Sequence, residues 1–181
     1  NPIVENSYEL GSIVKALTVA TGLDLGVITA ETTYDDKGFS IYNTKRISNF
    51  DGKARGVVPI QEVLNQSLNV GSAFVADRIG KERFRNYFTR FGLGEETGID
   101  LPNEGVGNID NLNSNRDIEF ATASFGQGIA VTPIAAIRAF SALANGGTLP
   151  SPHIVERIEY GMGASRNFVS GEERRVIKTS T

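Results

Sequence analysis

The segment Ser12-Ile13-Val14-Lys15 sets a hydroxyl and an amine three residues apart, directly after Gly11 and at the head of a stretch with apolar periodicity. Residues three apart on a helix share a face, with Cβ atoms roughly 5–6 Å apart, so Lys15 can reach the Ser12 hydroxyl within one turn. Such a pair can act as a nucleophile and its base. Because an unperturbed lysine titrates at about pH 10.4, this interpretation also requires a pocket that holds Lys15 neutral. The alternative is an ordinary helix start with Ser12 near the cap and a solvated Lys15.

A second hydroxyl pattern bears on this choice. Ser67-Leu68-Asn69 places an amide two residues after a hydroxyl, at the end of the apolar segment 59–66, and both side chains can point into one cleft. The same pattern recurs at Ser165-Arg166-Asn167, close to several glycines. The short pattern itself does not distinguish the two occurrences, so the surrounding sequence has to decide.

The surrounding sequence matches one family in several separate places. Residues 8–15 read Tyr-Glu-Leu-Gly-Ser-Ile-Val-Lys, residues 67–71 read Ser-Leu-Asn-Val-Gly, and residues 97–102 read Thr-Gly-Ile-Asp-Leu-Pro. Further segments of this kind are 90–94, 124–128, 131–133 and 142–147. In this order they resemble the transpeptidase domain of the monofunctional, class B penicillin-binding proteins of the cell-division and elongation type, which carry Ser-x-x-Lys and Ser-x-Asn motifs. The resemblance covers most of residues 1–155 and selects Ser67 over Ser165.

The sequence departs from the family pattern at Leu10, at the third motif and at both ends of the chain. Leu10 stands where the family usually has proline, and no Lys-Thr-Gly is present. Lys178-Thr179-Ser180 is a poor substitute, because Ser180 stands where glycine lets backbone and ligand approach closely, and we interpret it as a helix start. We therefore expect residues 1–181 to form a single, partial transpeptidase domain truncated at both ends. The flanking sequence is expected to encode a membrane anchor upstream and a Lys-Thr-Gly motif downstream.

The resemblance implies a serine acyl-enzyme mechanism. Ser12 would attack the carbonyl between two terminal D-alanines of a peptidoglycan stem peptide, and Lys15 would take the hydroxyl proton. Ser67 would relay a proton to the departing amine, and Asn69 would bind and orient the donor amide. β-Lactam antibiotics would acylate the same Ser12. Half of the oxyanion hole belongs to the absent Lys-Thr-Gly strand, and losing one such donor costs about 10²–10³ in rate, so this piece alone should be nearly inactive.

The implied fold class is α+β, the helix-rich portion of the serine β-lactamase and transpeptidase-like fold, in which helices flank an antiparallel sheet. The flanking strands of that sheet are expected to be missing from this chain. Residue patterns predict only short strands within 32–56, a loop over 103–117, and a core aromatic stripe on the third helix after the nucleophile. The predicted helices cover 12–23, 59–67, a stretch from 70, 84–91 and 133–144, with a strand over 154–160.

Composition narrows the function classes. A net charge of -3 and a pI near 5.3, without a basic stripe, argue against nucleic acid as a partner. The absence of cysteine excludes disulfides, thiolate metal sites and a cysteine nucleophile, and no cofactor or metal is expected. The resemblance implies an extracytoplasmic location, periplasmic or on the outer face of the cytoplasmic membrane, with proteins of a cell-wall synthesis complex as partners.

Two alternative functions remain open. One is a β-lactamase or β-lactam sensor of the same fold, which would hydrolyse the acyl-enzyme or signal from it. The other is a non-catalytic cell-wall scaffold, for which the missing third motif leaves room. A Ser-His-Asp triad would have to use His153, the only histidine, and a surface role suits that residue better.

Overall fold

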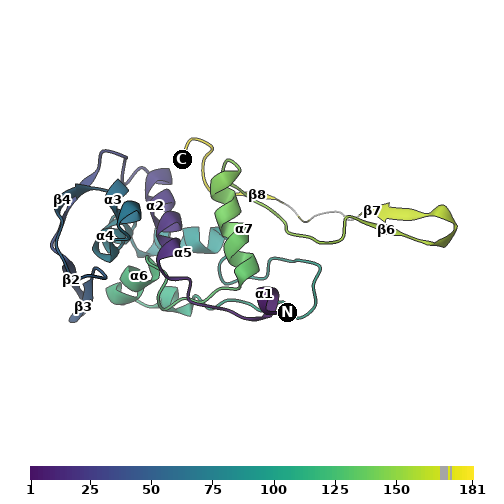
Figure 1. Ribbon diagram of the computed structural model, residues 1–181, viewed down its shortest axis with the longest axis horizontal. Helices are drawn as coiled ribbons and strands as arrows, with labels where there is room; N and C mark the ends of the chain where they lie inside the picture. The colour runs from purple at the N-terminus through teal and green to yellow at the C-terminus, as the bar shows by residue number, and fades with distance from the viewer. Residues whose placement is uncertain (168–170, 172) are drawn as a thin grey trace.

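Helix α2 (Lys15–Asp24) runs through the middle of the computed structural model, which describes residues 1–167, 171 and 173–181 (Figure 1). The helices that contact it are α3 (Gln61–Asn65), α4 (Asn69–Ile79), α5 (Lys81–Arg90) and α7 (Pro133–Ala144). Because helices surround α2, small and apolar residues occupy most of its positions. At Gly22 an added Cβ would lie 2.9 Å from Ile28 and 3.0 Å from Val75, so the glycine allows α4 to approach closely.

The aromatic stripe of α5 forms a large part of the core, as the sequence predicted. Phe84 and Phe88 are fully buried and stack with ring centroids 4.1 Å apart, and Phe120 meets Phe84 edge-on at 6.1 Å. Burial of each such side chain stabilises the fold by roughly 1.5–3 kcal/mol. Phe120 comes from α6 (Asp117–Ala123), a helix that the sequence analysis did not anticipate. Its signal was the acidic first turn, which favours a helix start.

Short antiparallel strands cover the side of α4 that faces away from α2 (Figure 1). Strand β1 (Thr33–Asp36) pairs with β4 (Gly56–Pro59), and β2 (Phe39–Tyr42) pairs with β3 (Lys45–Ser48). Near the C-terminus β5 (Thr148–Leu149) pairs with β8 (Arg174–Arg175), and β6 (Arg157–Glu159) pairs with β7 (Ser165–Asn167). These two-stranded sheets beside a helical core confirm the predicted α+β class.

One predicted helix was wrong at both ends. Pro59 is the last residue of β4, opposite Thr33, and α3 begins only at Gln61 and ends at Asn65. A proline is tolerated at the end of a strand because it removes a hydrogen bond only where the ladder stops. Ser67 therefore lies outside any helix, with a φ of 55°. The predicted strand over 154–160 is also shorter, since β6 covers only Arg157–Glu159.

Helix α7 begins as predicted. The Thr132 side chain accepts a hydrogen bond from the Ala135 N–H at 3.3 Å, and Pro133 occupies the first turn. The remaining short helices are α1 (Pro2–Glu5) and the 3₁₀ turns η1 (Gly11–Val14), η2 (Asp110–Asn113) and η3 (Gly161–Gly163). In the described part of the chain, no helix combines the length and the apolar character needed to cross a membrane.

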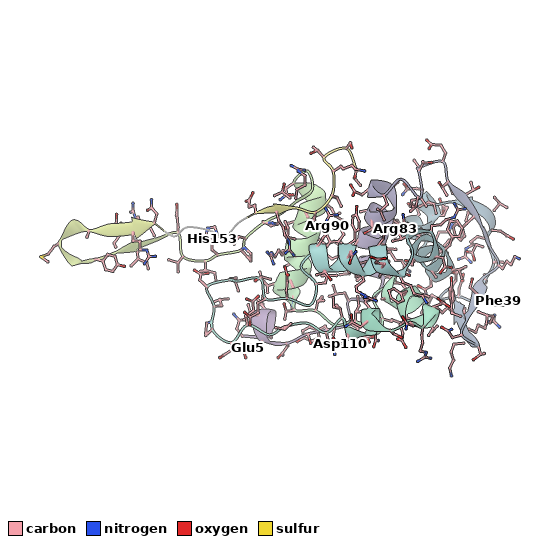
Figure 2. All side chains as sticks on the ribbon, turned by 180° about the vertical axis from the view of Figure 1, so that it is seen from behind. Glu5, Phe39, Arg83, Arg90, Asp110 and His153 are labelled. Atoms are coloured by element: carbon pink, nitrogen blue, oxygen red, sulfur yellow. The ribbon has the colours of Figure 1, made fainter. Side chains whose placement is uncertain are left out.

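The β6–β7 hairpin extends away from the helical body (Figure 1). Seen from behind, His153 lies on the connection between that body and the hairpin (Figure 2). The second Ser-x-Asn pattern, Ser165 to Asn167, is strand β7 itself and is exposed. The hairpin therefore carries Ser165 away from α2, which separates it from the Ser12 region.

Candidate active site

Ser12 lies in the 3₁₀ turn η1, which runs directly into α2. The loop that follows α6 contacts this turn: the Gly11 N–H donates a hydrogen bond to the Gly126 carbonyl at 3.2 Å. Both glycines have positive φ, 61° and 77°. Ser12 is exposed, whereas Lys15, one turn later, is 1% exposed. The serine hydroxyl is thus open to a ligand while the amine next to it is not.

Lys15 joins the two predicted motifs. Its Nζ donates to the Ser12 Oγ at 3.1 Å, to the Ser67 Oγ at 3.0 Å and to the Ser67 carbonyl oxygen at 2.6 Å. A positive φ is uncommon for a residue other than glycine, and here it accompanies a Ser67 whose hydroxyl and carbonyl both face Lys15. The three donors of the ammonium group are therefore all used.

Burial lowers the pKa of Lys15 to about 8, because removal from water disfavours the charged amine. None of the ion pairs between described residues includes Lys15, so no carboxylate opposes this effect through direct contact. With such a pKa roughly one lysine in ten is neutral at pH 7, against fewer than one in a thousand for an ordinary lysine. The pocket that the sequence required, but could not reveal, is therefore present.

A cleft of about 330 Å³ opens beside Ser12. Its wall includes Ser67, Asn69, Phe125, Gln127 and Phe50. The Asn69 Nδ2 donates to the Ser48 carbonyl at 3.0 Å, which ties the second motif to β3. On the other side of Ser12 lies a more apolar hollow of about 530 Å³, bordered by Ile13, Ala16, Leu64 and Phe140. Ser12 thus stands between a cleft of mixed polar and apolar lining and a mostly apolar hollow.

Sequence reasoning missed Phe50 and Gln127 as residues of this cleft. Phe50 lies on the loop between β3 and β4 with its side chain fully exposed, and Gln127 follows the glycine that contacts Gly11. Neither belongs to a short motif with its own chemistry. Only the packing of these loops against η1 and α4 brings them to Ser12, so no sequence signal could have found Phe50.

One carbonyl bridges α2 and α4 in addition to their apolar packing. The Ser124 carbonyl oxygen accepts from the Thr18 Oγ1 at 2.8 Å and from the Ser72 Oγ at 2.7 Å, and all three residues are fully buried. A buried hydroxyl that is left without a partner costs about 1–3 kcal/mol, so these bonds resist displacement. They hold the helix that carries Lys15 against the helix that begins at Asn69.

Lys178 lies elsewhere. Its N–H donates to the Asp24 carboxylate at 2.7 Å, and its Nζ donates to the Asp24 carbonyl at 2.5 Å. Asp24 is the last residue of α2, so Lys178 contacts the end of that helix opposite Ser12.

Within the described residues, no group of three or more histidine, cysteine, aspartate or glutamate side chains is arranged to hold a metal ion.

The whole chain, residues 1–181, matches the protein family described as the penicillin binding protein transpeptidase domain. The chain belongs to this family. The transpeptidase domain is 37% identical to stage V sporulation protein D of Bacillus subtilis over 154 residues, which cover 84% of this chain and 24% of that protein. It is 33% identical to the probable peptidoglycan D,D-transpeptidase FtsI of Caulobacter vibrioides over 181 residues, which cover 100% of this chain and 29% of that protein.

Solved structures agree with this assignment. Penicillin binding protein 3 from Mycobacterium tuberculosis, complexed with aztreonam, superposes on the transpeptidase domain with a TM-score of 0.92 at 25% identity, covering 99% of this chain and 40% of that one. The same protein has been solved in complex with ampicillin. The transpeptidase domain described here thus spans less than a third of the two curated relatives and two fifths of this solved chain.

Substituting Gly126 tests how tightly the nucleophile turn is held. A Cβ at Gly126 would lie 2.3 Å from the Gly11 carbonyl oxygen, and the positive φ adds strain. We expect Gly126→Ala to lower the free energy of unfolding by roughly 1–3 kcal/mol, as measured by urea denaturation. Gly161→Ala is the control, since a Cβ there meets nothing within 4 Å. Equal unfolding midpoints for the two variants would contradict a tight contact.

Proposed function

We propose that this chain provides the nucleophile and proton-transfer groups of a peptidoglycan D,D-transpeptidase, with Ser12 as nucleophile and Lys15 as its base. The observation that carries the proposal is the buried Lys15 amine, which bonds the hydroxyls of both Ser12 and Ser67. A base must lie within about 2.6–3.2 Å of the proton it removes, and the 3.1 Å between Nζ and Ser12 Oγ meets this requirement.

The chemistry follows from these contacts. Neutral Lys15 removes the hydroxyl proton as the Ser12 Oγ attacks the carbonyl carbon between the two terminal D-alanines of a stem peptide. The Ser12 N–H contributes to an oxyanion hole. Lys15 then returns this proton to the Ser67 Oγ as Ser67 passes its own proton to the departing D-alanine amine. Asn69 hydrogen-bonds the donor amide. An amine of a neighbouring stem peptide then takes the acyl group from Ser12. A β-lactam ring would be opened by the same attack.

We extend the proposal to the protein as a whole. The absent Lys-Thr-Gly motif, and the share of each relative that the chain spans, support a partial transpeptidase domain in which flanking sequence supplies that motif and a membrane anchor. An extracytoplasmic location and partners in a cell-wall synthesis complex follow from the substrate, since peptidoglycan is cross-linked outside the cytoplasm. The complexes of the M. tuberculosis relative with aztreonam and ampicillin support β-lactams as ligands.

Labelling with a fluorescent penicillin tests the proposal in the natural polypeptide that contains these residues. A transpeptidase is expected to form a covalent adduct that survives gel electrophoresis and is released slowly. Rapid release of hydrolysed penicillin would identify a β-lactamase instead. Absence of any adduct would identify a non-catalytic scaffold and overturn the assignment of Ser12.

The pKa of Lys15 predicts how acylation depends on pH. Only the neutral amine can accept the Ser12 proton, so the rate should follow the neutral fraction, which rises through a pKa of about 8. We expect the second-order rate constant for penicillin acylation to rise roughly tenfold between pH 6 and pH 7 and to level off above about pH 8.5. Stopped-flow measurements from pH 6 to 9.5 would show this. A flat profile would exclude Lys15 as the titrating base.

A further inference from the structure

A buried amide and a buried carboxylate lie behind the second motif. Asn49, on the loop after β3, is 4% exposed, and Asp36, the last residue of β1, is fully buried. The Asn49 Nδ2 donates to both carboxylate oxygens of Asp36, at 3.0 and 2.8 Å. The Gly38 N–H donates to the same carboxylate at 2.8 Å, and the Lys53 carbonyl also accepts from Asn49 Nδ2 at 3.2 Å. The amide nitrogen of Asn49 and both carboxylate oxygens of Asp36 thus all have hydrogen-bond partners.

The other end of the Asn49 amide reaches α4. Its Oδ1 accepts a hydrogen bond from the Val70 N–H at 3.2 Å. The first N–H groups of a helix have no acceptor within the helix, and the residue at the N-cap of α4, Leu68, has no side chain that could provide one. Asn49 therefore caps α4 from outside, 21 residues earlier in the chain.

Asp36 determines which way the amide faces. A side-chain amide has a donor end and an acceptor end, and the carboxylate can only be approached by the donor end. The oxygen of Asn49 is thereby turned toward the Val70 N–H. Without the carboxylate, only the Lys53 carbonyl would still accept from the Asn49 NH₂ group, so the orientation that turns the amide oxygen toward Val70 would be held less strongly.

The capped turn is the one that carries Ser67 and Asn69. Lys15 holds Ser67 from one side, through the two hydrogen bonds described above. From the other side the Ser48 carbonyl holds Asn69, and Asn49, the next residue in the chain, holds Val70. Since Ser67 has a positive φ, which costs free energy for any residue with a Cβ, contacts on both sides are needed to keep this turn in one conformation.

We propose that Asn49, oriented by Asp36, is a positioning residue for the reaction: it acts through the Val70 N–H to hold Ser67 and Asn69 toward Ser12. The proposal rests on the proposed function, because it takes Ser67 and Asn69 as the groups that meet the substrate. Asn49 itself touches no reacting atom. Its removal should therefore slow the acylation step more than it weakens the initial binding of penicillin, because Ser67 and Asn69 are loosened but still present.

Amide hydrogen exchange tests the positioning directly and needs no activity. In Asn49→Ala, the Val70 N–H is expected to lose roughly tenfold or more of its protection, while the amides of α5 keep theirs. Unchanged protection at Val70 would overturn the proposal, whether or not the parent protein is acylated by penicillin. An unlabelled parent with the predicted exchange would instead overturn the proposed function alone.

Acylation kinetics test the consequence. Asn49→Ala and Asp36→Asn are each expected to lower the acylation rate constant roughly tenfold. The exchange Asp36→Asn/Asn49→Asp should recover part of that loss, because the amide at position 36 can donate to the carboxylate at position 49, whose second oxygen can still accept from Val70. Recovery stays incomplete because the Lys53 carbonyl loses the donor that Asn49 supplied. This double variant keeps the test decisive if a single variant fails to fold. No recovery in the folded double variant would contradict the role of Asp36.

A mutant cycle separates positioning from general stability. In an Asn69→Ala background, Asn49→Ala should lower acylation by clearly less than the tenfold expected in the parent, because one of the two groups it positions is already gone. Full additivity would overturn the proposal. Thr97→Val is the matched control, since Thr97 is 5% exposed and donates to Glu104 outside the cleft, and it should leave acylation unchanged.

Discussion

Replacing Ser12 by alanine is expected to abolish covalent labelling by penicillin, because the attacking oxygen is lost and Ser67, the other described hydroxyl bonded to Lys15, is less exposed. Ser12 is exposed and its Oγ is bonded to Lys15, whereas Ser67, whose Oγ is also bonded to Lys15, is half-buried. Removing the nucleophile of a serine acyl-transfer site lowers the rate by about 10⁶ in the best-measured case. Intact mass measurement after penicillin treatment should show no adduct.

Peptide mapping of the unmutated protein provides the positive arm of this test. The adduct is expected on the peptide that contains Ser12. Ser165→Ala should label like the parent, since Ser165 belongs to the exposed hairpin and not to the helical body (Figure 1). An adduct on Ser165, or one that persists in Ser12→Ala, would refute the assignment of the site.

Lys15→Arg is expected to lower the rate of acylation by about 10²–10⁴, the range assigned to acid–base catalysis. Arginine keeps a cation at this position but cannot release its proton at any pH at which proteins are folded. The unmutated lysine is 1% exposed, and its burial lowers the pKa to about 8, so it can supply the neutral amine that arginine cannot. The rate constant for acylation by penicillin measures the loss.

Folding must be checked alongside, because arginine is larger than lysine and the site is closed. Lys15→Met serves as the matched control, since it has a similar length, no charge and no proton to transfer. Both variants should lose acylation to a similar degree while retaining the far-ultraviolet circular dichroism of the parent. Acylation of a folded Lys15→Arg variant within a few-fold of the parent would show that Lys15 is not the base.

Local backbone geometry explains what could be predicted from the sequence. The contact between Ser12 and Lys15 needs only one turn of helix, so the spacing alone brought the hydroxyl and the amine together. The cap of α7 at Thr132 and the buried stripe along α5 could be predicted for the same reason, because each depends on residues within a turn or two of one another. The family resemblance added Ser67 and Asn69 to the predicted site, because the family's segments occur in the same order along this chain.

Other features depended on residues far apart in the chain. The helix predicted from Pro59 to Ser67 begins only at Gln61, because Pro59 pairs with Thr33 of β1 and is part of a strand, which a local pattern cannot show. Phe50 reaches the cleft only because its loop packs over α4, and the cap on Val70 comes from Asn49, 21 residues away. Each of these contacts is made by side chains or strands that sequence spacing does not relate.

The sequence by itself therefore determined the pair Ser12 and Lys15, the helical framework that carries it, and the family to which both belong. Only the tertiary structure showed that Ser67, which the resemblance had selected over Ser165 without giving the contact, shares with Ser12 the amine of Lys15, 52 residues away. The tertiary structure also determined the lowered pKa of Lys15. A helix turn sets distances between near neighbours whatever surrounds it, whereas a pKa depends on how completely the packed chain excludes water, and that is a property of the whole fold.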